Sequence, residues 1–242
     1  MEFEQGAARA LDTAQKRGAA YADVRHERIR EERVEVRNGE VAALSDQRTS
    51  GYGIRAFCEG AWGFAASDDA SDAGIDRTAA RAVAIAHASS AIAKRRFAEA
   101  PSERYVDRFA TPVERDPRGV SVGERVAYLL DVEKHLHAEP SIRVGRAWID
   151  LWRTEKEFYS TTGSRIEQTI VQSGSGIRTL AVSETDAQDR SFPGDIGFYQ
   201  TGGWEIVEEA RLRENALRIG EEAHQLLSAP QAPAGELDVI LG

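Results

Sequence analysis

Apolar residues near the start of the chain recur at spacings of three and four, which is the period of a helix buried on one side. This stripe predicts a helix over residues 2–17 that ends at Gly18. From Tyr21 the period changes to two, so the chain is expected to continue as β-strands. The stripe consists of Phe3, Ala7, Leu11 and Ala14.

Asn38-Gly39 lies between two alternating apolar runs and predicts a β-hairpin. A type I′ turn needs positive φ at both central residues, and Asn-Gly is the pair that adopts it most readily. The expected cross-strand pairs are Val36 with Val41 and Val34 with Ala43.

A second hairpin is expected around Glu59-Gly60. One of its faces is aromatic and the other is made of small residues, which suits close packing against a helix. That helix is expected over residues 74–97. The expected pairs are Phe57 with Trp62, Arg55 with Phe64, Ala56 with Gly63 and Ile54 with Ala65.

Three prolines among charged residues mark 98–120 as a linker, with one short edge strand around residues 105–109. Ser121 and Glu124 have the spacing of a capping box, so a helix is expected to begin there and to end before Pro140. Strands are predicted over 142–153, 155–161, 164–173 and 176–184, with turns at Thr162-Gly163 and Gly174-Ser175, followed by a helix over 203–227 and a strand over 237–241.

These elements predict an α+β fold of two small domains, each with mainly antiparallel sheet packed against helices. We place an N-terminal domain at 1–97, a linker at 98–120 and a middle domain at 121–228. Residues 229–242 are predicted to be a second linker and the first strand of a further unit. The sequence is therefore expected to be the N-terminal part of a longer protein.

The composition narrows the possible functions. The chain has 242 residues and a formal charge of −9, from 31 basic and 40 acidic residues, which argues against a nucleic-acid partner. Its single cysteine, Cys58, excludes an intramolecular disulfide and fits a reducing cytoplasm. No run of about 18–20 apolar residues would span a membrane, and the acidic N-terminus is unlike a secretory signal. We expect a cytoplasmic protein without a membrane partner.

The candidate chemical groups do not form a catalytic set. His135 and His137 are two residues apart on a helix, so they point about 200° apart and cannot share a metal ion. His26 lies in a charged run predicted to be a solvated strand face, and no second histidine follows at metal-binding spacing. Cys58 is interpreted as a core residue rather than a nucleophile. We therefore predict no catalytic residue and no metal ligand in this chain, and substrate-binding residues stay unknown.

A dinucleotide-binding loop is also rejected. Gly51-Tyr-Gly53-Ile-Arg-Ala56 fits the glycine spacing superficially, but the pattern continues as a strand where that loop would open a helix. The glycines are interpreted as positions where a helix or a second backbone approaches the sheet.

Four blocks resemble the N-terminal domain of the TldD/PmbA family of metallopeptidases, once labelled modulators of DNA gyrase. Their order and spacing match over about residues 18–90, a weaker resemblance covers 120–228, and Trp-Gly-Phe-Ala is more like the TldD branch than the PmbA (TldE) branch. The blocks are Ala22-Asp-Val-Arg25, Val36-Arg-Asn-Gly39, Ser50-Gly-Tyr-Gly-Ile-Arg-Ala-Phe57 and Gly60-Ala-Trp-Gly-Phe-Ala-Ala66.

The resemblance implies a zinc metallopeptidase that cleaves small unfolded peptides. It also implies that the zinc ligands, a His-Glu-x-x-x-His helix and a later cysteine, lie beyond Gly242, so this fragment alone would be inactive. Family members form homodimers or heterodimers with a PmbA/TldE-like subunit, and their first two domains help to form the dimer and wall the cavity. The alternatives are a non-catalytic partner subunit or peptide-binding module, and, ranked last, a free-standing α+β domain.

The first hairpin gives a direct test. Gly39→Val is expected to lower the free energy of unfolding by more than about 1 kcal/mol, because a β-branched residue is strained at positive φ. Thermal denaturation measures the change, and an unaltered thermal stability would show that the turn is not type I′.

Overall fold

The structure is a computed structural model that describes residues 3–98, 103–230, 235–236 and 238. Its described part contains five α-helices, one 3₁₀ helix and a mostly antiparallel eight-stranded sheet, which confirms the α+β class. In chain order the elements are α1 (Glu4–Lys16), β1 (Tyr21–Arg37), β2 (Glu40–Cys58), β3 (Ala61–Ser67), α2 (Asp72–Ile92), β4 (Val106–Ala110), η1 (Pro117–Gly119), α3 (Val122–Leu136), β5 (Ile142–Ser160), β6 (Arg165–Val182), β7 (Ala187–Phe192), β8 (Phe198–Thr201), α4 (Trp204–Glu209) and α5 (Leu212–Leu226).

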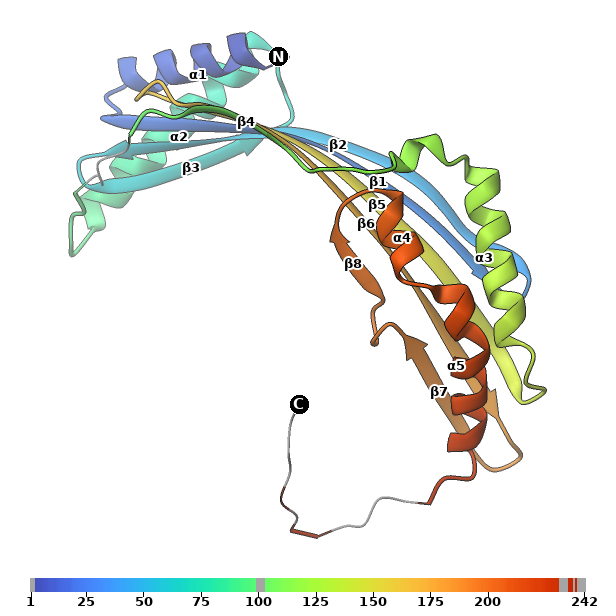
Figure 1. The fold of residues 1–242 in the computed structure, drawn as a ribbon. Helices are drawn as coiled ribbons and strands as arrows, with labels where there is room; N and C mark the ends of the chain where they lie inside the picture. The colour runs from blue at the N-terminus through green and yellow to red at the C-terminus, as the bar shows by residue number, and fades with distance from the viewer. Residues whose placement is uncertain (1–2, 99–102, 231–234, 237, 239–242) are drawn as a thin grey trace.

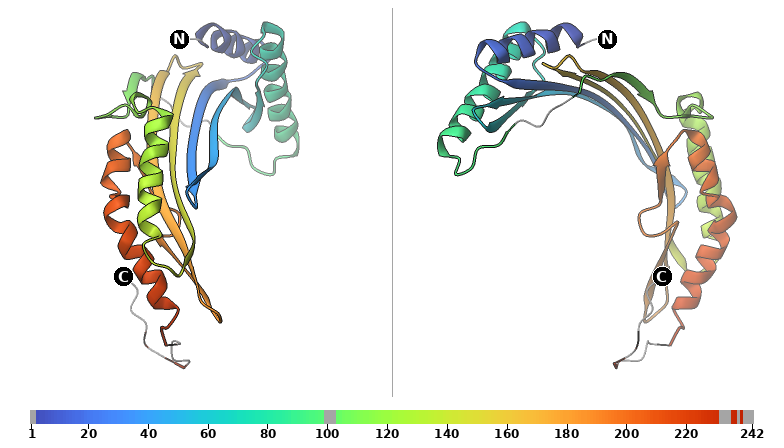
Figure 2. Two further views of the ribbon diagram at one scale, coloured as in Figure 1. Left: turned by 90° about the vertical axis from the view of Figure 1, so that its right-hand side faces the viewer. Right: turned by 60° about the vertical axis from the view of Figure 1, so that its left-hand side comes forward.

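Four long strands form the centre of a single sheet. The strand order is β3-β2-β1-β5-β6-β4, with β7 and β8 also paired to β6, and only β4 runs parallel to its neighbour. The sheet arches along its length, with α1 and α2 at one end and α3, α4 and α5 at the other (Figure 1). The second view in Figure 2 shows α3 and α5 on the outer side of the arch.

The helices share one face of the sheet. In β1 the even-numbered residues Ala22 and Val24 pack in the core of α1 and α2, and Val34 and Val36 pack in the core of α3 and α5. Side chains alternate along a strand, so these four residues point to the same side. The sheet therefore carries two separate cores on one face. Strands from both halves of the chain belong to this one sheet. The sheet therefore does not test the predicted boundaries of the two domains, which stay a prediction.

The close packing expected on the small-residue face is present. All four predicted pairs of the second hairpin occur, and Gly63 lies directly under α2. A Cβ added to Gly63 would lie 2.0 Å from the Ala82 carbonyl oxygen and 2.4 Å from the Ala86 amide nitrogen. Only glycine fits at this contact, so this position sets the distance between β3 and α2.

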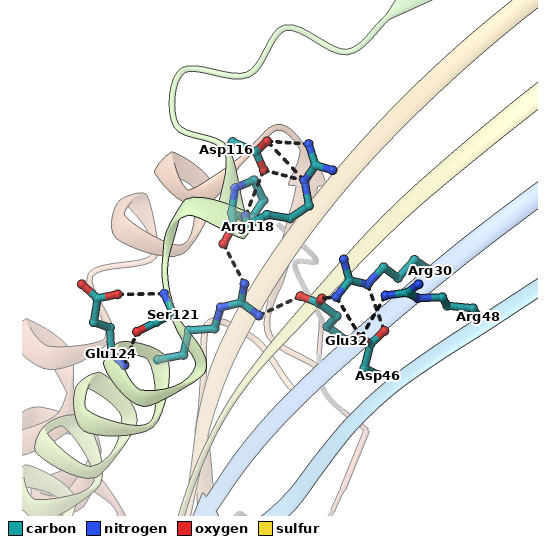
Figure 3. A network of polar contacts seen from close by, with 10 residues as sticks. Arg30, Glu32, Asp46, Arg48, Asp116, Arg118, Ser121 and Glu124 are labelled. Carbon is teal, nitrogen blue, oxygen red and sulfur yellow. Dashed lines mark hydrogen bonds and ion pairs between the residues drawn. The ribbon is translucent and has the colours of Figure 1, made fainter.

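The start of α3 is fixed by polar contacts (Figure 3). The capping box is confirmed, since Ser121 accepts from the Glu124 amide and Glu124 accepts from the Ser121 amide. Arg125 is 4% exposed; it donates to Glu32 on β1 over 2.8 Å and to the Pro117 carbonyl over 2.7 Å. This buried guanidinium therefore joins the linker and α3 to the middle of the sheet.

Most predicted elements occur, with differences at their ends. The first helix, its end at Gly18 (φ +96°) and the linker's edge strand are confirmed. The predicted helix over 74–97 instead ends at Ile92. Asn38 and Gly39 have φ of +51° and +78°, as a type I′ turn requires. The strand predicted over 237–241 lies outside the described residues.

The register of the first hairpin was predicted correctly only next to the turn. Val36 lies opposite Val41 as expected, but Val34 lies opposite Leu44 and not Ala43. The reason is a β-bulge, in which one extra residue of β2, Ala42, lies between the Val36–Val41 pair and the Glu35–Ala43 pair.

The predicted second half was too fragmented. Residues 142–160 form one strand and 165–182 another, so Gly174-Ser175 is not a turn. The last helix is two helices, α4 and α5, because Arg211 adopts a left-handed conformation at φ +47°. Strands β7 and β8 were not predicted.

Gly63→Ala is expected to lower the free energy of unfolding by about 1–3 kcal/mol, because backbone atoms of α2 occupy the space that a Cβ needs. Urea denaturation measures the difference. Gly119→Ala is the control, since a Cβ there meets nothing within 4 Å. Equal stability of the two variants would show that α2 moves away from β3 without cost.

Candidate functional site

The sheet face opposite the helices carries the candidate site, which we call the open face. It is formed by the odd-numbered side chains of β1 and their cross-strand partners on β2 and β5. Its β1 side chains are mostly charged, and β5 adds the rings of Trp148, Trp152 and Phe158. The open face lies on the inner side of the arch (Figure 2). From β1 it receives Tyr21, Asp23, Arg25, Glu27, Ile29, Glu31, Arg33, Glu35 and Arg37.

A buried hydrogen-bond network lies where the Tyr199 side chain, from β8, reaches over Gly174 to β5 on this face. The Tyr199 hydroxyl donates to Asp150 Oδ2 over 2.8 Å and accepts from the Trp148 indole N–H over 2.9 Å. Arg33 donates to both oxygens of Asp150, over 2.7 and 2.8 Å. Trp148 and Asp150 are each 5% exposed. Every polar atom named here has a partner, so the network holds β5, β1 and β8 in fixed relation.

Ion pairs continue the network toward the hairpin tip. Glu35 accepts from Arg33 over 2.9 Å and from Arg146 over 2.8 Å. Burial by itself would raise the pKa of Glu35, but these two hydrogen bonds outweigh it and hold that pKa below its usual value. Glu35 is therefore a carboxylate at neutral pH.

The chemistry of this network favours binding over catalysis. Burial is the largest cause that raises the pKa of Tyr199 to about 12, so its phenol stays protonated at neutral pH. The Asp150 carboxylate accepts three hydrogen bonds and is 5% exposed, so both of its oxygens are held within the network. These groups are suited to holding and orienting a chain.

A groove lies on the open face where β3 ends and β2 continues. Gly51 and Gly53 form part of its floor, and Ile29 and Phe64 line it. The Phe64 ring covers Gly53, where an added Cβ would lie 2.8 Å from Cε2, and the ring is itself 57% exposed. At Gly51 an added Cβ would lie 3.4 Å from the Ser67 carbonyl oxygen, which is an ordinary contact, so no second backbone requires glycine there.

The singled-out cysteine and N-terminal histidine are both buried. Cys58 lies in the core of α1 and α2, where burial raises the pKa of its thiol, so its interpretation as a core residue is confirmed. The prediction that His26 lies on a solvated face is wrong. His26 is 7% exposed, because Phe3 stacks on its ring at 4.5 Å, and its Nε2 lies 3.2 Å from Ser50 Oγ.

His135 and His137 have different partners, as their helical spacing predicts. His135 Nδ1 lies 2.6 Å from the Asp131 carbonyl oxygen, whereas His137 Nε2 lies 2.6 Å from Glu133 Oε1. Within 3–98 and 103–230, no three residues of the types that bind metal ions come together. These residues do not fit a metal site, and no chemical step is assigned to a metal here.

Trp148, Asp150 and Tyr199 could not be predicted to form a unit from the sequence. The available sign was a pair of glycines, Gly174 and Gly176, which lie opposite Asp150 and Trp148. A Cβ on Gly174 would lie 1.9 Å from Tyr199 Cδ1, and one on Gly176 would lie 2.4 Å from Trp148 Cζ2. Glycine inside a strand marks such close approach, although the same residues also favour turns.

Comparisons with known proteins agree on one family. Residues 22–86 match the model of PmbA/TldA metallopeptidase domain 1, and residues 115–229 match the PmbA/TldA metallopeptidase central domain. A metalloprotease of Methanothermobacter thermautotrophicus is 26% identical over 91% of this chain and 46% of its own length. A metalloprotease of Methanocaldococcus jannaschii is 22% identical over 91% of this chain and 48% of its own. The chain thus spans about half the length of the curated relatives it matches.

Solved structures share the fold. A proposed modulator of DNA gyrase from Thermotoga maritima covers 96% of this chain with a TM-score of 0.71 at 17% identity, and 50% of that protein is matched. TldE from Thermococcus kodakarensis covers 92% with a TM-score of 0.56 at 12% identity, and 47% of it is matched. No helix in the described part of the chain is long and apolar enough to cross a membrane.

Tyr199→Phe is expected to lower the free energy of unfolding by about 1–3 kcal/mol, because it leaves the buried Trp148 N–H without a partner and removes one of the two hydrogen bonds to Asp150 Oδ2. Urea denaturation followed by tryptophan fluorescence measures this. Tyr105→Phe is the matched control, since its exposed hydroxyl bonds only Glu103. If both variants lose the same stability, the Tyr199 hydroxyl is not a structural bridge.

Proposed function

The chain belongs to the PmbA/TldD metallopeptidase family, and from this premise we propose that it is the N-terminal part of a TldD-like zinc metallopeptidase that cleaves small unfolded peptides. The two matched family models and the metalloproteases of twice the length support the parent activity. In this proposal the zinc ligands lie beyond Gly242, and the protein acts in the cytoplasm.

The open face carries the proposed role of this fragment, which is to wall the substrate cavity. Its rings and charges lie along one continuous, inward-curving sheet, and several of its ionisable groups are held in ion pairs, among them Arg33 with Asp150 and Glu27 with Lys156. Asp23 is fully buried, bonded by Arg55 over 2.6 Å and by Arg25 over 3.0 Å. A surface of this kind can hold an extended chain by ring contacts and hydrogen bonds, while carboxylates such as that of Asp23 stay bonded to arginines.

Assembly is part of the same proposal. The protein would act as a homodimer or as a heterodimer with a PmbA/TldE-like subunit, so that two sheets enclose the cavity. The rival assignment is a non-catalytic partner subunit or peptide-binding module, in which the full-length protein binds no metal.

Elemental analysis of the full-length protein beside this 242-residue chain tests the proposal. We expect stoichiometric zinc and cleavage of an unfolded peptide by the full-length protein, both abolished by a chelator, and neither in the fragment. Zinc in the fragment would contradict the placement of the ligands. Zinc and activity in neither would support the partner-subunit assignment instead.

A further inference from the structure

One half of β2 has no neighbour on its outer side. β3 pairs with β2 only from Tyr52 to Cys58, and no described residue pairs with the same side of β2 between Ala43 and Gly51. These nine residues form a strand about 30 Å long at 3.4 Å per residue. We call this stretch, residues 43–51, the free edge.

The hairpins fix which backbone groups of the free edge are unpaired. Cys58 and Ala61 flank a two-residue turn, so they exchange hydrogen bonds, and even-numbered residues of β2 turn their N–H and C=O toward β3. The same alternation continues along the strand. Outward-pointing donors and acceptors are therefore presented by Leu44, Asp46, Arg48 and Ser50.

Natural sheets protect long edges with proline, charged side chains (above all lysine) or bulges, because an unprotected edge recruits another strand. Between Ala43 and Gly51 the free edge has no proline, lysine or bulge. Its two charged side chains, Asp46 and Arg48, form ion pairs within the sheet and can also pair with charges on an added strand. Its two ends, however, are closed. The bulge at Ala42 interrupts the strand at one end, and Ser67 of β3 occupies the position beside Tyr52 at the other.

We propose that the free edge binds an extended peptide as an added antiparallel strand, in line with β3. This deepens the proposed function and rests on it, since it assigns a second docking place for the unfolded peptide class. The closed ends favour a short segment over a second copy of this chain. If the free edges of two copies paired antiparallel about Gln47, the first hairpin of one copy would run into Ser67 of the other. If they paired about a residue nearer the hairpin tip, the strand would meet the bulge at Ala42.

The flanking side chains indicate which peptide fits. On the helix-bearing side, Asp46 is already held by Arg30 over 2.9 and 2.8 Å. The Arg48 side chain is 70% exposed, and its guanidinium comes no nearer to Asp46 than 3.6 Å, which is a looser ion pair. An acidic residue is therefore favoured opposite Arg48. On the open face, Thr49 also lines the groove, so an apolar residue is favoured opposite it. The position opposite exposed Leu44 also favours an apolar residue.

The test uses a fluorescein-labelled peptide, Thr-Val-Glu-Thr-Lys-Thr-Val, whose residues lie opposite Ser50 to Leu44 in turn. Binding to the unmodified 242-residue chain is measured by fluorescence anisotropy. N-methylation of the third and fifth residues, which lie opposite Arg48 and Asp46, removes amides that would bond β2 and is expected to weaken binding at least about tenfold. N-methylation of the second and fourth residues, whose amides point away, is expected to change it less than about twofold. Equal binding of both methylated peptides, or no binding of the parent peptide, overturns the proposal.

Variants of the chain give a second readout. Arg48→Pro removes one outward donor at an edge position that tolerates proline, so binding should fall at least about tenfold. Arg48→Ala keeps the donor and loses only the charge, and binding should fall about threefold. A dimer in light scattering that Arg48→Pro dissolves would assign the edge to a second copy and reject the peptide.

This experiment separates the two proposals. Suppose the full-length protein contains zinc and cleaves peptides, but the 242-residue chain does not bind the labelled peptide. This result rejects the docking place and leaves the proposed function standing. Binding with the expected methylation pattern, beside a metal-free and inactive full-length protein, supports the docking place and rejects the peptidase.

Discussion

The pairing of β1 with β5 is the constraint on which the rest of the structure depends. It runs without interruption from Asp23 opposite Ser160 to Arg37 opposite Arg146, and β1 is paired to β2 along the same length. The α1–α2 core lies at one end of this ladder and the α3–α5 core at the other. Because both cores are built on the same strands, the position of one relative to the other is set by backbone hydrogen bonds rather than by a hinge.

The one-sided placement of the helices follows from the even-numbered residues of β1 and determines where binding can occur. Burial of those residues leaves the odd-numbered face for charged and aromatic side chains, and ion pairs such as Arg33–Asp150 and Arg55–Asp23 neutralise it locally. The glycines of β2 and β6 then determine which parts of that face are covered by rings and which parts stay open. Gly174 receives a tyrosine ring, whereas Gly51 lies at an open groove.

Local rules were sufficient where the interactions are local. The Asn38-Gly39 turn, the capping box and the pairs of the second hairpin depend on residues within a few positions of one another, and all could be predicted. The Gly174-Ser175 stretch was misread as a turn because the ring that occupies the space above Gly174 comes from Tyr199, which the sequence does not place there. The bulge at Ala42 and the left-handed Arg211 are not marked by a glycine, proline or asparagine at those positions. The same limit hid the Asp150 network, whose members come from three strands.

The long β1–β5 ladder also has a consequence for synthesis on the ribosome. Its paired residues are separated by 137 positions at one end (160 − 23) and 109 at the other (146 − 37). Contacts of such long range form slowly, because a large loop must close before they contribute. The N-terminal hairpins and α2 can assemble as soon as they emerge, but the second side of β1 stays uncovered until β5 leaves the exit tunnel. During that interval the nascent chain exposes a strand of seventeen residues, which is the kind of surface that cellular chaperones shield.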